Sequence, residues 1–164
     1  MSFSFTFRDL LLPPKNILKE AGIKPGFRIF DYGCGPGSFT IAAAELAGKF
    51  GKVYALDIHP PAIKRVQKIA AKNKVTNIET ICSDCATGLD NESIDVVLLY
   101  DTLHSLTNPE SILEELHRIL KPHSVLSFRD HHLKEGEILA KMTDKGLFRL
   151  LEKGKRTYNF SKEV

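Results

Sequence analysis

The stretch IFDYGCGPGSFTIA, residues 29–42, places three glycines two positions apart directly after a short apolar run. That run, FRIFDY at residues 27–32, is bounded by Pro25-Gly26 and by the glycines, as is typical of a buried strand. Apolar side chains then recur at helical spacing as far as Gly48. Because glycine has no Cβ, the turn between strand and helix lets the backbone approach a ligand closely. The stretch therefore predicts a strand–turn–helix unit that binds a cofactor.

The rest of the chain alternates between strand-like and helix-like segments. We expect strands at 52–57, 77–84, 93–101 and 124–130, helices at 60–73, 108–122 and 134–146, and a hairpin at 147–160 turning at Lys153-Gly154. Such alternation predicts right-handed crossovers and a parallel sheet covered on both faces. We therefore expect an α/β fold, Rossmann-like and doubly wound. Its seven-stranded sheet would be mostly parallel, with helices on both faces and a C-terminal antiparallel hairpin.

The composition is that of one globular domain spanning residues 1–164. The chain is 43% hydrophobic and 26% charged, which argues against global disorder. A net charge of +3 is too small to indicate a nucleic-acid partner. No apolar run approaches the roughly 20 residues that cross a bilayer, so we expect no membrane partner.

The cysteines and the start of the chain bear on its location. Cys34, Cys82 and Cys85 are an odd number without a disulfide framework, which suits a reducing cytoplasm, and we interpret all three as structural. The start MSFSFTFRDLLLPP has neither a basic region nor a small-residue cleavage site, so we expect no secretion signal. The segment 1–22 is apolar enough to cover a site or to form a homodimer contact.

The glycine loop differs from a nicotinamide dinucleotide fingerprint. Gly33, Gly35 and Gly37 are present, but Ser38 stands where the last glycine of G-x-G-x-x-G belongs. Asp31 lies two residues ahead of the loop. A carboxylate there would repel a pyrophosphate and would suit a ligand that carries an ammonium group. The loop therefore favours a cofactor without phosphate.

Two further acids follow in order along the chain. Asp57 ends the second predicted strand about 20 residues beyond the loop, the separation expected of a ribose-binding acid. Its alternative role is to cap the helix that follows. Asp84 comes after the third strand, where an Asx turn is the alternative.

The motif DYGCGPGSF, with these two acids after it, resembles the class I S-adenosylmethionine-dependent methyltransferases. The resemblance extends over essentially the whole chain, and it implies S-adenosyl-L-methionine as the cofactor. It places an acid such as Asp31 near the methionine end, with the three glycines giving close backbone approach. Cys34 lies inside this loop, where a small side chain fits.

The same resemblance implies contacts to the nucleoside. Asp57 would accept from both ribose hydroxyls, and Ile58 would contact the adenine. Asp84 would accept from the exocyclic amine, and the backbone N–H of Cys85 would donate to the ring. Tyr100 faces the same crevice if the first and fourth strands flank the point where strand order reverses.

Histidines and acids gather after the fourth and fifth strands. The segment LLYDTLHSL supplies Asp101 and His104, and FRDHH supplies Asp130, His131 and His132. Histidine is the natural general base for a neutral acceptor, so we assign that role to His104, with His131 or His132 as the second candidate and Asp101 as a further catalytic residue. An exposed polar loop is the alternative. Carboxylate and imidazole also suit a divalent metal, but neighbouring histidines point to opposite faces of a strand, so we assign none.

The acceptor is expected to be a small molecule. The Asn/Asp-Pro-Pro-aromatic motif of enzymes that methylate base nitrogens is replaced here by LYDTLH, which disfavours nucleic acid. VVLLYDTLHSL is most similar to the small-molecule branch, which includes quinone-pathway enzymes. Methylation of RNA or protein, a non-catalytic cofactor-binding subunit, and a nicotinamide dehydrogenase are the alternatives.

Overall fold

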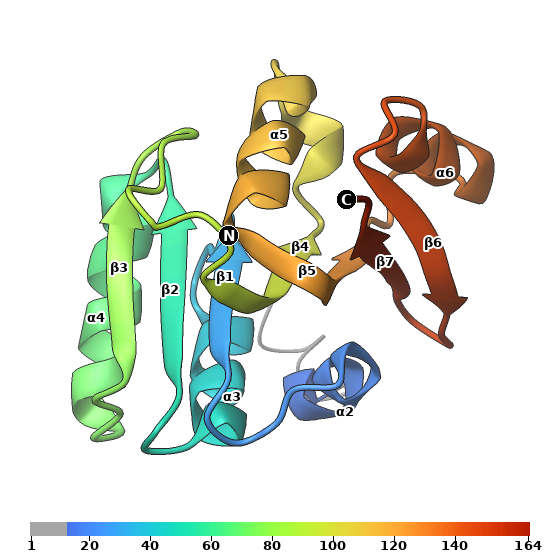
Figure 1. Ribbon diagram of the computed structural model, residues 1–164. Helices are drawn as coiled ribbons and strands as arrows, with labels where there is room; N and C mark the ends of the chain where they lie inside the picture. The colour runs from blue at the N-terminus through green and yellow to red at the C-terminus, as the bar shows by residue number, and fades with distance from the viewer. Residues whose placement is uncertain (1–12) are drawn as a thin grey trace.

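The computed structural model describes residues 13–164, and the expected α/β fold is confirmed. One seven-stranded sheet has the order β3-β2-β1-β4-β5-β7-β6 (Figure 1). The strands are β1 (Arg28–Tyr32), β2 (Lys52–Asp57), β3 (Ile78–Cys82), β4 (Ile94–Tyr100), β5 (Leu120–Arg129), β6 (Phe148–Lys153) and β7 (Tyr158–Lys162). The first five pair in parallel, whereas β7 is antiparallel to both β5 and β6. The order of the strands in the sheet reverses beside β1, because β2 lies on one side of β1 and β4 lies on the other.

The helices cover both faces of the sheet. They are α2 (Pro14–Leu18), α3 (Ser38–Ala47), α4 (Pro60–Lys72), α5 (Pro109–Ile119) and α6 (Glu135–Thr143), with two short 3₁₀ turns, η1 (Lys19–Ala21) and η2 (Leu103–Ser105). Apolar residues of α2 and α3 pack on one face, and those of α5 and α6 on the other. Asn108 caps α5 by accepting from the Ser111 N–H at 3.4 Å, as the Asn-Pro start predicts.

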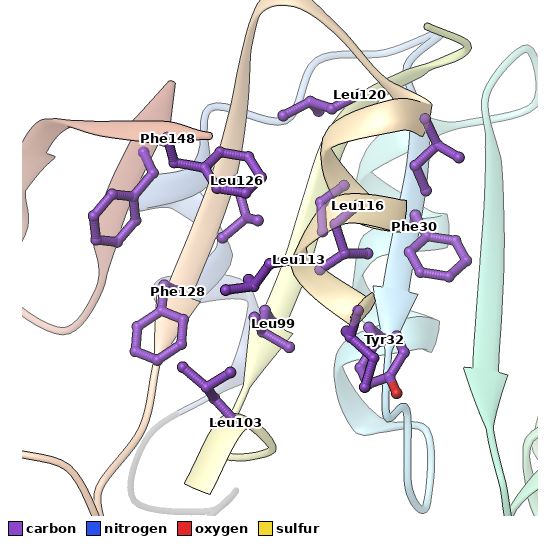
Figure 2. Packing of buried hydrophobic residues seen from close by; sticks show 14 of the residues in the cluster. Phe30, Tyr32, Leu99, Leu103, Leu113, Leu116, Leu120, Leu126, Phe128 and Phe148 are labelled. Atoms are coloured by element: carbon purple, nitrogen blue, oxygen red, sulfur yellow. The ribbon is translucent and has the colours of Figure 1, made fainter. Parts of the chain in front are cut away.

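Alternation along the strands decides which face each side chain meets. In β1, Ile29 belongs to the cluster with α3, whereas Phe30 and Tyr32 belong to the cluster with α5. Figure 2 shows the latter cluster, in which the fully buried Leu116 lies beside Phe30. Side chains two residues apart in a strand share a face, so Asp31 lies on the α3 side.

Two local differences from the predicted elements have physical causes. The helix α5 ends at Ile119 rather than at residue 122, because a residue that precedes proline avoids the helical region and Pro122 lies just beyond. Leu120 already pairs with Ile94 in the sheet. The turn η2 was not predicted, since only one turn of helix forms there. The hairpin does turn at Gly154, as expected.

A contact between distant parts of the chain holds this hairpin. The Glu20 carboxylate accepts from the Thr157 N–H at 2.9 Å, from the Thr157 hydroxyl at 2.7 Å, and from the Arg156 N–H at 3.2 Å. The Asn159 amide donates to the Glu20 carbonyl at 2.6 Å. These hydrogen bonds lower the pKa of Glu20 against the opposing effect of burial. The Glu20 carboxylate therefore accepts hydrogen bonds from the N–H groups of this turn, as a capping side chain does at the start of a helix.

Within residues 13–164, none of the helices has the length and apolar character needed to cross a bilayer. The predicted cover or dimer contact falls partly on residues 1–12, which lie outside the described residues. Residues 14–21 form α2 and η1, and Ile17, Leu18 and Ala21 are buried against the α3 side of the sheet.

Candidate active site

A cavity of about 760 Å³ opens at the carboxyl ends of β1, β2 and β4, within the range of small-ligand sites. This is the predicted switch point of the sheet. Six of the predicted site residues line it, namely Gly33, Asp57, Ile58, Asp84, Cys85 and Asp101. The rest of its wall comes from Tyr32, Leu56, His59, Ser83 and the segment between β4 and α5.

The glycine loop needs its glycines for two different reasons. All three have positive φ, with values of 70° at Gly33, 51° at Gly35 and 91° at Gly37. A Cβ at Gly33 would lie 2.6 Å from Thr102 Oγ1, and one at Gly37 would lie 2.8 Å from Val66 Cγ2. A Cβ at Gly35 would meet nothing within 4 Å. Gly33 and Gly37 are therefore packed against protein, whereas Gly35 presents its backbone to open space.

Asp31 lies beneath the loop, not in the cavity wall. It is only 3% exposed, and the Thr40 hydroxyl of α3 donates to its carboxylate at 2.7 Å. Burial raises its pKa to about 6, with the Asp57 charge adding to the shift and the Thr40 hydrogen bond opposing it. The pair Asp31 and Asp57 thus concentrates negative potential beside the loop. This potential suits a cation and disfavours a phosphate.

Asp57 joins the loop to the second strand. Its carboxylate accepts from the Gly35 N–H at 3.0 Å and from the His59 N–H at 2.9 Å. The second bond is to the N-cap residue of α4 itself, and α4 has no side-chain cap, so the alternative that Asp57 caps this helix is wrong. The His59 ring also lies 2.9 Å away through its Nδ1. Each carboxylate oxygen has two lone pairs, so acceptor capacity is left for a ligand.

The residues predicted to contact the adenine lie on the α5 side of the sheet. The Tyr32 hydroxyl donates to the Asp84 carbonyl, which fixes the turn after β3 against β1. The Cys85 thiol lies 3.6 Å from the Ser111 carbonyl, and burial raises its pKa. Ile58 is 58% exposed at the cavity rim. An exposed apolar side chain there offers a surface for a flat ring.

Tyr100 and Cys34 lie away from the cavity wall. The Tyr100 hydroxyl is 2.7 Å from Ser127 Oγ, and its ring meets Phe39 of α3 edge-on at 4.9 Å. It faces α3 because Leu98 and Tyr100 share one face of β4. Cys34 packs with Ala55 and Val66, and burial raises the pKa of its thiol. A thiol that stays protonated supports its predicted structural role.

A buried aspartate orients His104. The Asp130 side chain is fully buried, and one of its oxygens accepts from the His104 N–H at 3.0 Å and lies 2.9 Å from His104 Nδ1. Burial opposes the charge, but hydrogen bonds from the His104 ring and from the backbone of His132 and His104 outweigh it and lower the pKa of Asp130. The ionised carboxylate holds the proton on His104 Nδ1. Within residues 13–164, His104 Nε2 has no hydrogen-bond partner and so keeps its lone pair.

His131 is placed differently. Its Nδ1 lies 2.7 Å from the Asp101 carboxylate, and its Nε2 accepts from the Arg129 guanidinium at 2.7 Å. Both ring nitrogens are therefore engaged, so His131 is a poorer candidate for a base than His104. The structure confirms that His131 and His132 contact different carboxylates, Asp101 and Asp130.

The segment between β4 and α5 supplies cavity residues that the motif search did not single out. These are Thr102, Ser105, Leu106, Thr107 and Asn108, and Ser111 and Ile112 follow them in α5. The Thr102 hydroxyl donates to the Tyr100 carbonyl at 2.9 Å, and the Ser105 hydroxyl to the Thr102 carbonyl at 2.9 Å. The signal that could have found them is their position, because any segment that follows β4 lies at the ligand-binding edge.

Known proteins share both the sequence and this architecture. The profile of a methyltransferase domain family matches residues 23–161. The ubiquinone/menaquinone biosynthesis C-methyltransferase UbiE of Hydrogenovibrio crunogenus is 30% identical over 142 residues, 85% of this chain and 56% of that protein. A demethylmenaquinone methyltransferase of Geobacillus stearothermophilus is 30% identical over 124 residues, 74% of this chain and 53% of that protein.

Among solved structures, a SAM-dependent methyltransferase from Aquifex aeolicus matches with a TM-score of 0.82 and 27% identity, covering 96% of this chain and 93% of that one. The chain spans about half the length of the curated relatives it matches. The family match, the strand order and the glycine loop agree: this chain belongs to the class I S-adenosylmethionine-dependent methyltransferases.

Proposed function

We propose that this chain is a methyltransferase that transfers the methyl group of S-adenosyl-L-methionine to a small-molecule acceptor. The observation that carries the proposal is the hydrogen bond from the Gly35 N–H to the Asp57 carboxylate at 3.0 Å. That bond joins the glycine loop to the proposed ribose-binding acid, and Gly33 and Asp57 both line the cavity of about 760 Å³. The residues present fit a nucleoside with a charged amino-acid tail.

The charge around the loop supports this cofactor over a dinucleotide. Asp31, Asp57 and Asp84 all lie at the carboxyl ends of neighbouring strands, and neither lysine nor arginine is among the cavity-lining residues. A pyrophosphate would meet two or three carboxylates at short range, which costs free energy in a partly buried site. A sulfonium and an ammonium group would be attracted instead.

Five of the predicted residues would act on the cofactor in this proposal. Asp57 would accept from the ribose hydroxyls, and the exposed Ile58 would cover one face of the adenine. Asp84 and the Cys85 N–H would recognise the adenine edge from the turn after β3. Asp31 would act on the ammonium group through the field beneath the loop, because its carboxylate is buried.

The bound cofactor supplies an electrophilic methyl group, and the chain's own residues align the acceptor and move a proton. Alignment in a closed site is worth about 7–11 kcal/mol in favourable cases. His104 is the proposed base, since Asp130 fixes the proton on Nδ1 and leaves Nε2 to accept one from the acceptor. The Ser105 and Thr102 hydroxyls, which line the cavity, would hold polar groups of the acceptor.

Two observations support a small-molecule acceptor. The relatives named above act, by their names, on quinones or their precursors, which are small molecules. The net charge of the chain is only +3, and basic residues are interleaved with aromatic ones in one short stretch, EKGKRTYNF at residues 152–160. The exclusion of nucleic acid, a cytoplasmic location and a homodimer are parts of the same proposal.

Calorimetric titration tests the cofactor assignment. We expect S-adenosyl-L-methionine to bind, and Asp57→Ala to weaken it by about 1.5–3 kcal/mol, the scale of a charge-assisted hydrogen bond. Asp90→Ala removes an exposed carboxylate remote from the cavity and should leave the affinity unchanged. Circular dichroism would check that each variant folds. Binding of NAD in place of the sulfonium nucleoside would overturn the proposal.

A further inference from the structure

We propose that Asp130, His104 and His132 form a binding site for one first-row divalent metal ion such as Zn²⁺. Each of the three offers a ligand atom, and these atoms all lie within 4.8 Å of one another. Two imidazoles and one carboxylate are a ligand set that suits zinc, iron or nickel rather than magnesium or calcium, which prefer oxygen. The inference goes beyond the proposed methyl transfer and does not depend on it.

The separations match those of ligands around a single ion. His104 Nδ1 lies 2.9 Å from one Asp130 oxygen, and His132 Nδ1 lies 3.6 Å from the other. Ligands about 2.0–2.1 Å from a tetrahedral zinc ion lie roughly 3.3 Å apart. The two observed separations fall on either side of this value. Small ring rotations would therefore suffice to complete the site.

The two imidazoles already converge on the carboxylate. Their ring centroids are 3.9 Å apart with an interplanar angle of 30°, so one ring lies over the other and both direct Nδ1 at Asp130. They reach this arrangement from different elements, since His104 belongs to η2 and His132 follows the end of β5. The prediction that His131 and His132 do not share a metal agrees with this geometry, because the partner of His132 is His104.

The carboxylate is fixed before any ion binds. The backbone N–H groups of His104 and His132 donate to different oxygens of Asp130, each at 3.0 Å. Such supporting hydrogen bonds orient metal ligands and are a regular part of metal sites. Each oxygen still has a lone pair that an ion could use in place of a ring N–H.

The site is open on one side. The Asp130 side chain is fully buried, whereas the side chains of His104 and His132 are 27% and 65% exposed. An ion held here would keep at least one position for water or for another ligand, as in zinc sites that are not purely structural. The exposed His132 ring can also rotate into place with little disturbance of the core.

Two similar pairs nearby lack the third ligand and serve as an internal comparison. Asp57 faces only the His59 ring, and Asp101 faces His131, whose second nitrogen accepts from the Arg129 cation. An ion at the second pair would be repelled by that guanidinium. Among the described residues, only the Asp130 cluster brings three such ligands together.

An ion here would change what His104 can do. It would occupy Nδ1, where the proton resides when His104 acts as the proposed base. Ion binding and that role are therefore mutually exclusive states of one residue. The test below measures binding alone, so its result is independent of methyl transfer.

Titration of the metal-free full chain with Zn²⁺ and with Mg²⁺ tests the site, with Co²⁺ absorption as a second probe. We expect one Zn²⁺ per chain and no Mg²⁺. His132→Ala, a change at an exposed side chain, should weaken Zn²⁺ binding about 10–100-fold, as should His104→Ala. Unchanged affinity in both variants, or no Zn²⁺ binding by the wild-type chain at micromolar concentration, would overturn the proposal.

Two matched variants exclude other sources of binding. His59→Ala removes a histidine that faces one aspartate without a third ligand, and it should keep wild-type affinity for Zn²⁺. Cys82→Ser removes an exposed thiol that could bind zinc by itself, and it should also keep that affinity. Loss of binding in Cys82→Ser, with binding kept in His132→Ala, would assign the ion to the cysteine and refute the site.

Discussion

The proposed cofactor side and the proposed acceptor side of the site are built on different principles. Asp57 of the first lines the cavity, whereas His104 and His131 of the second are not among its lining residues. On the cofactor side, the acids Asp31 and Asp57 are buried or nearly so and bond to the loop and to neighbouring helices. On the acceptor side, aspartates hold histidine rings that reach toward solvent, with exposed fractions of 27% at His104 and 50% at His131. The first arrangement fixes a backbone shape, whereas the second fixes the direction of proton-bearing side chains. In the proposed function, cofactor recognition and proton transfer therefore occupy separate neighbouring parts of one sheet edge.

The largest expected effect separates the two histidines of the acceptor side. His104→Ala should lower kcat at least about 100-fold if a proton must leave the acceptor, because it removes the ring whose Nδ1 proton Asp130 fixes, leaving Nε2 to accept a proton. His131→Ala should lower kcat much less, since both of its nitrogens are already engaged. Transfer of labelled methyl groups to fractionated cell extract would supply the acceptor and the rates. Equal rates in His104→Ala and wild type would remove the proposed base, and cofactor affinity should stay constant in both variants.

A second change tests the close contact between Gly33 of the glycine loop and Thr102, which follows β4. Gly33→Ala places a Cβ 2.6 Å from Thr102 Oγ1 at a φ of 70°, so we expect a loss of unfolding free energy of about 2–3 kcal/mol. Gly22→Ala is the matched control, because φ is 69° there and nothing lies within 4 Å. It should cost only about 1 kcal/mol. Urea denaturation would measure both, and equal losses would show that the contact with Thr102 is unimportant.

The buried acid of the cofactor side predicts a pH dependence. The pKa of Asp31 is raised to about 6 from a model-compound value of 3.8, so the folded chain binds more protons than the unfolded chain between these values. Its contribution to stability is therefore complete below about pH 4 and is lost as pH rises through 6. Asp31→Asn abolishes this loss while Asn Oδ1 can still accept from Thr40.

We accordingly expect Asp31→Asn to be about 2 kcal/mol more stable than wild type at pH 8, with the difference vanishing toward pH 4. Chemical denaturation across this range would measure it. Cofactor affinity should fall in the same variant, since the ammonium group loses its counter-charge. A variant of equal stability at all pH values would show that Asp31 is not strained by burial.

The smallest effect concerns Tyr100. Tyr100→Phe removes a hydroxyl that is 2.7 Å from Ser127 Oγ, so stability should fall by about 1 kcal/mol. Cofactor affinity should not change, because this side chain packs on α3 away from the cavity wall. Thermal unfolding and calorimetric titration measure the two quantities. A loss of affinity without a loss of stability would restore the contact predicted from the sequence.

Most helices and strands could be predicted from the sequence, because the local signals agree with the global fold. Glycines with positive φ, alternating apolar strands and the Asn-Pro start of α5 each indicate their own element. Tyr100 shows what local signals omit. Its position at the end of β4 was predicted, but its direction depends on which face α3 covers, and this is a property of the assembled sheet.

The pairing of aspartates with histidines was also beyond the sequence. That three histidines gather at one edge follows from strand ends, and the structure confirms it. Which ring meets which carboxylate depends on the register of β4 and β5, where Tyr100 lies opposite Arg129. The turn η2 then decides that His104 reaches Asp130 rather than Asp101. No sequence motif indicates either the register of β4 and β5 or the turn η2.

The hydrogen bonds between Glu20 and the hairpin affect when the chain can complete its fold during synthesis. The groups that donate to Glu20 lie 136 to 139 residues later in the chain. A ribosome therefore cannot complete this contact until residues 156–159 have emerged, and closing so long a loop is slow. Until then the β7 neighbour of β5 is missing, and that strand's edge is open to pairing with other nascent chains.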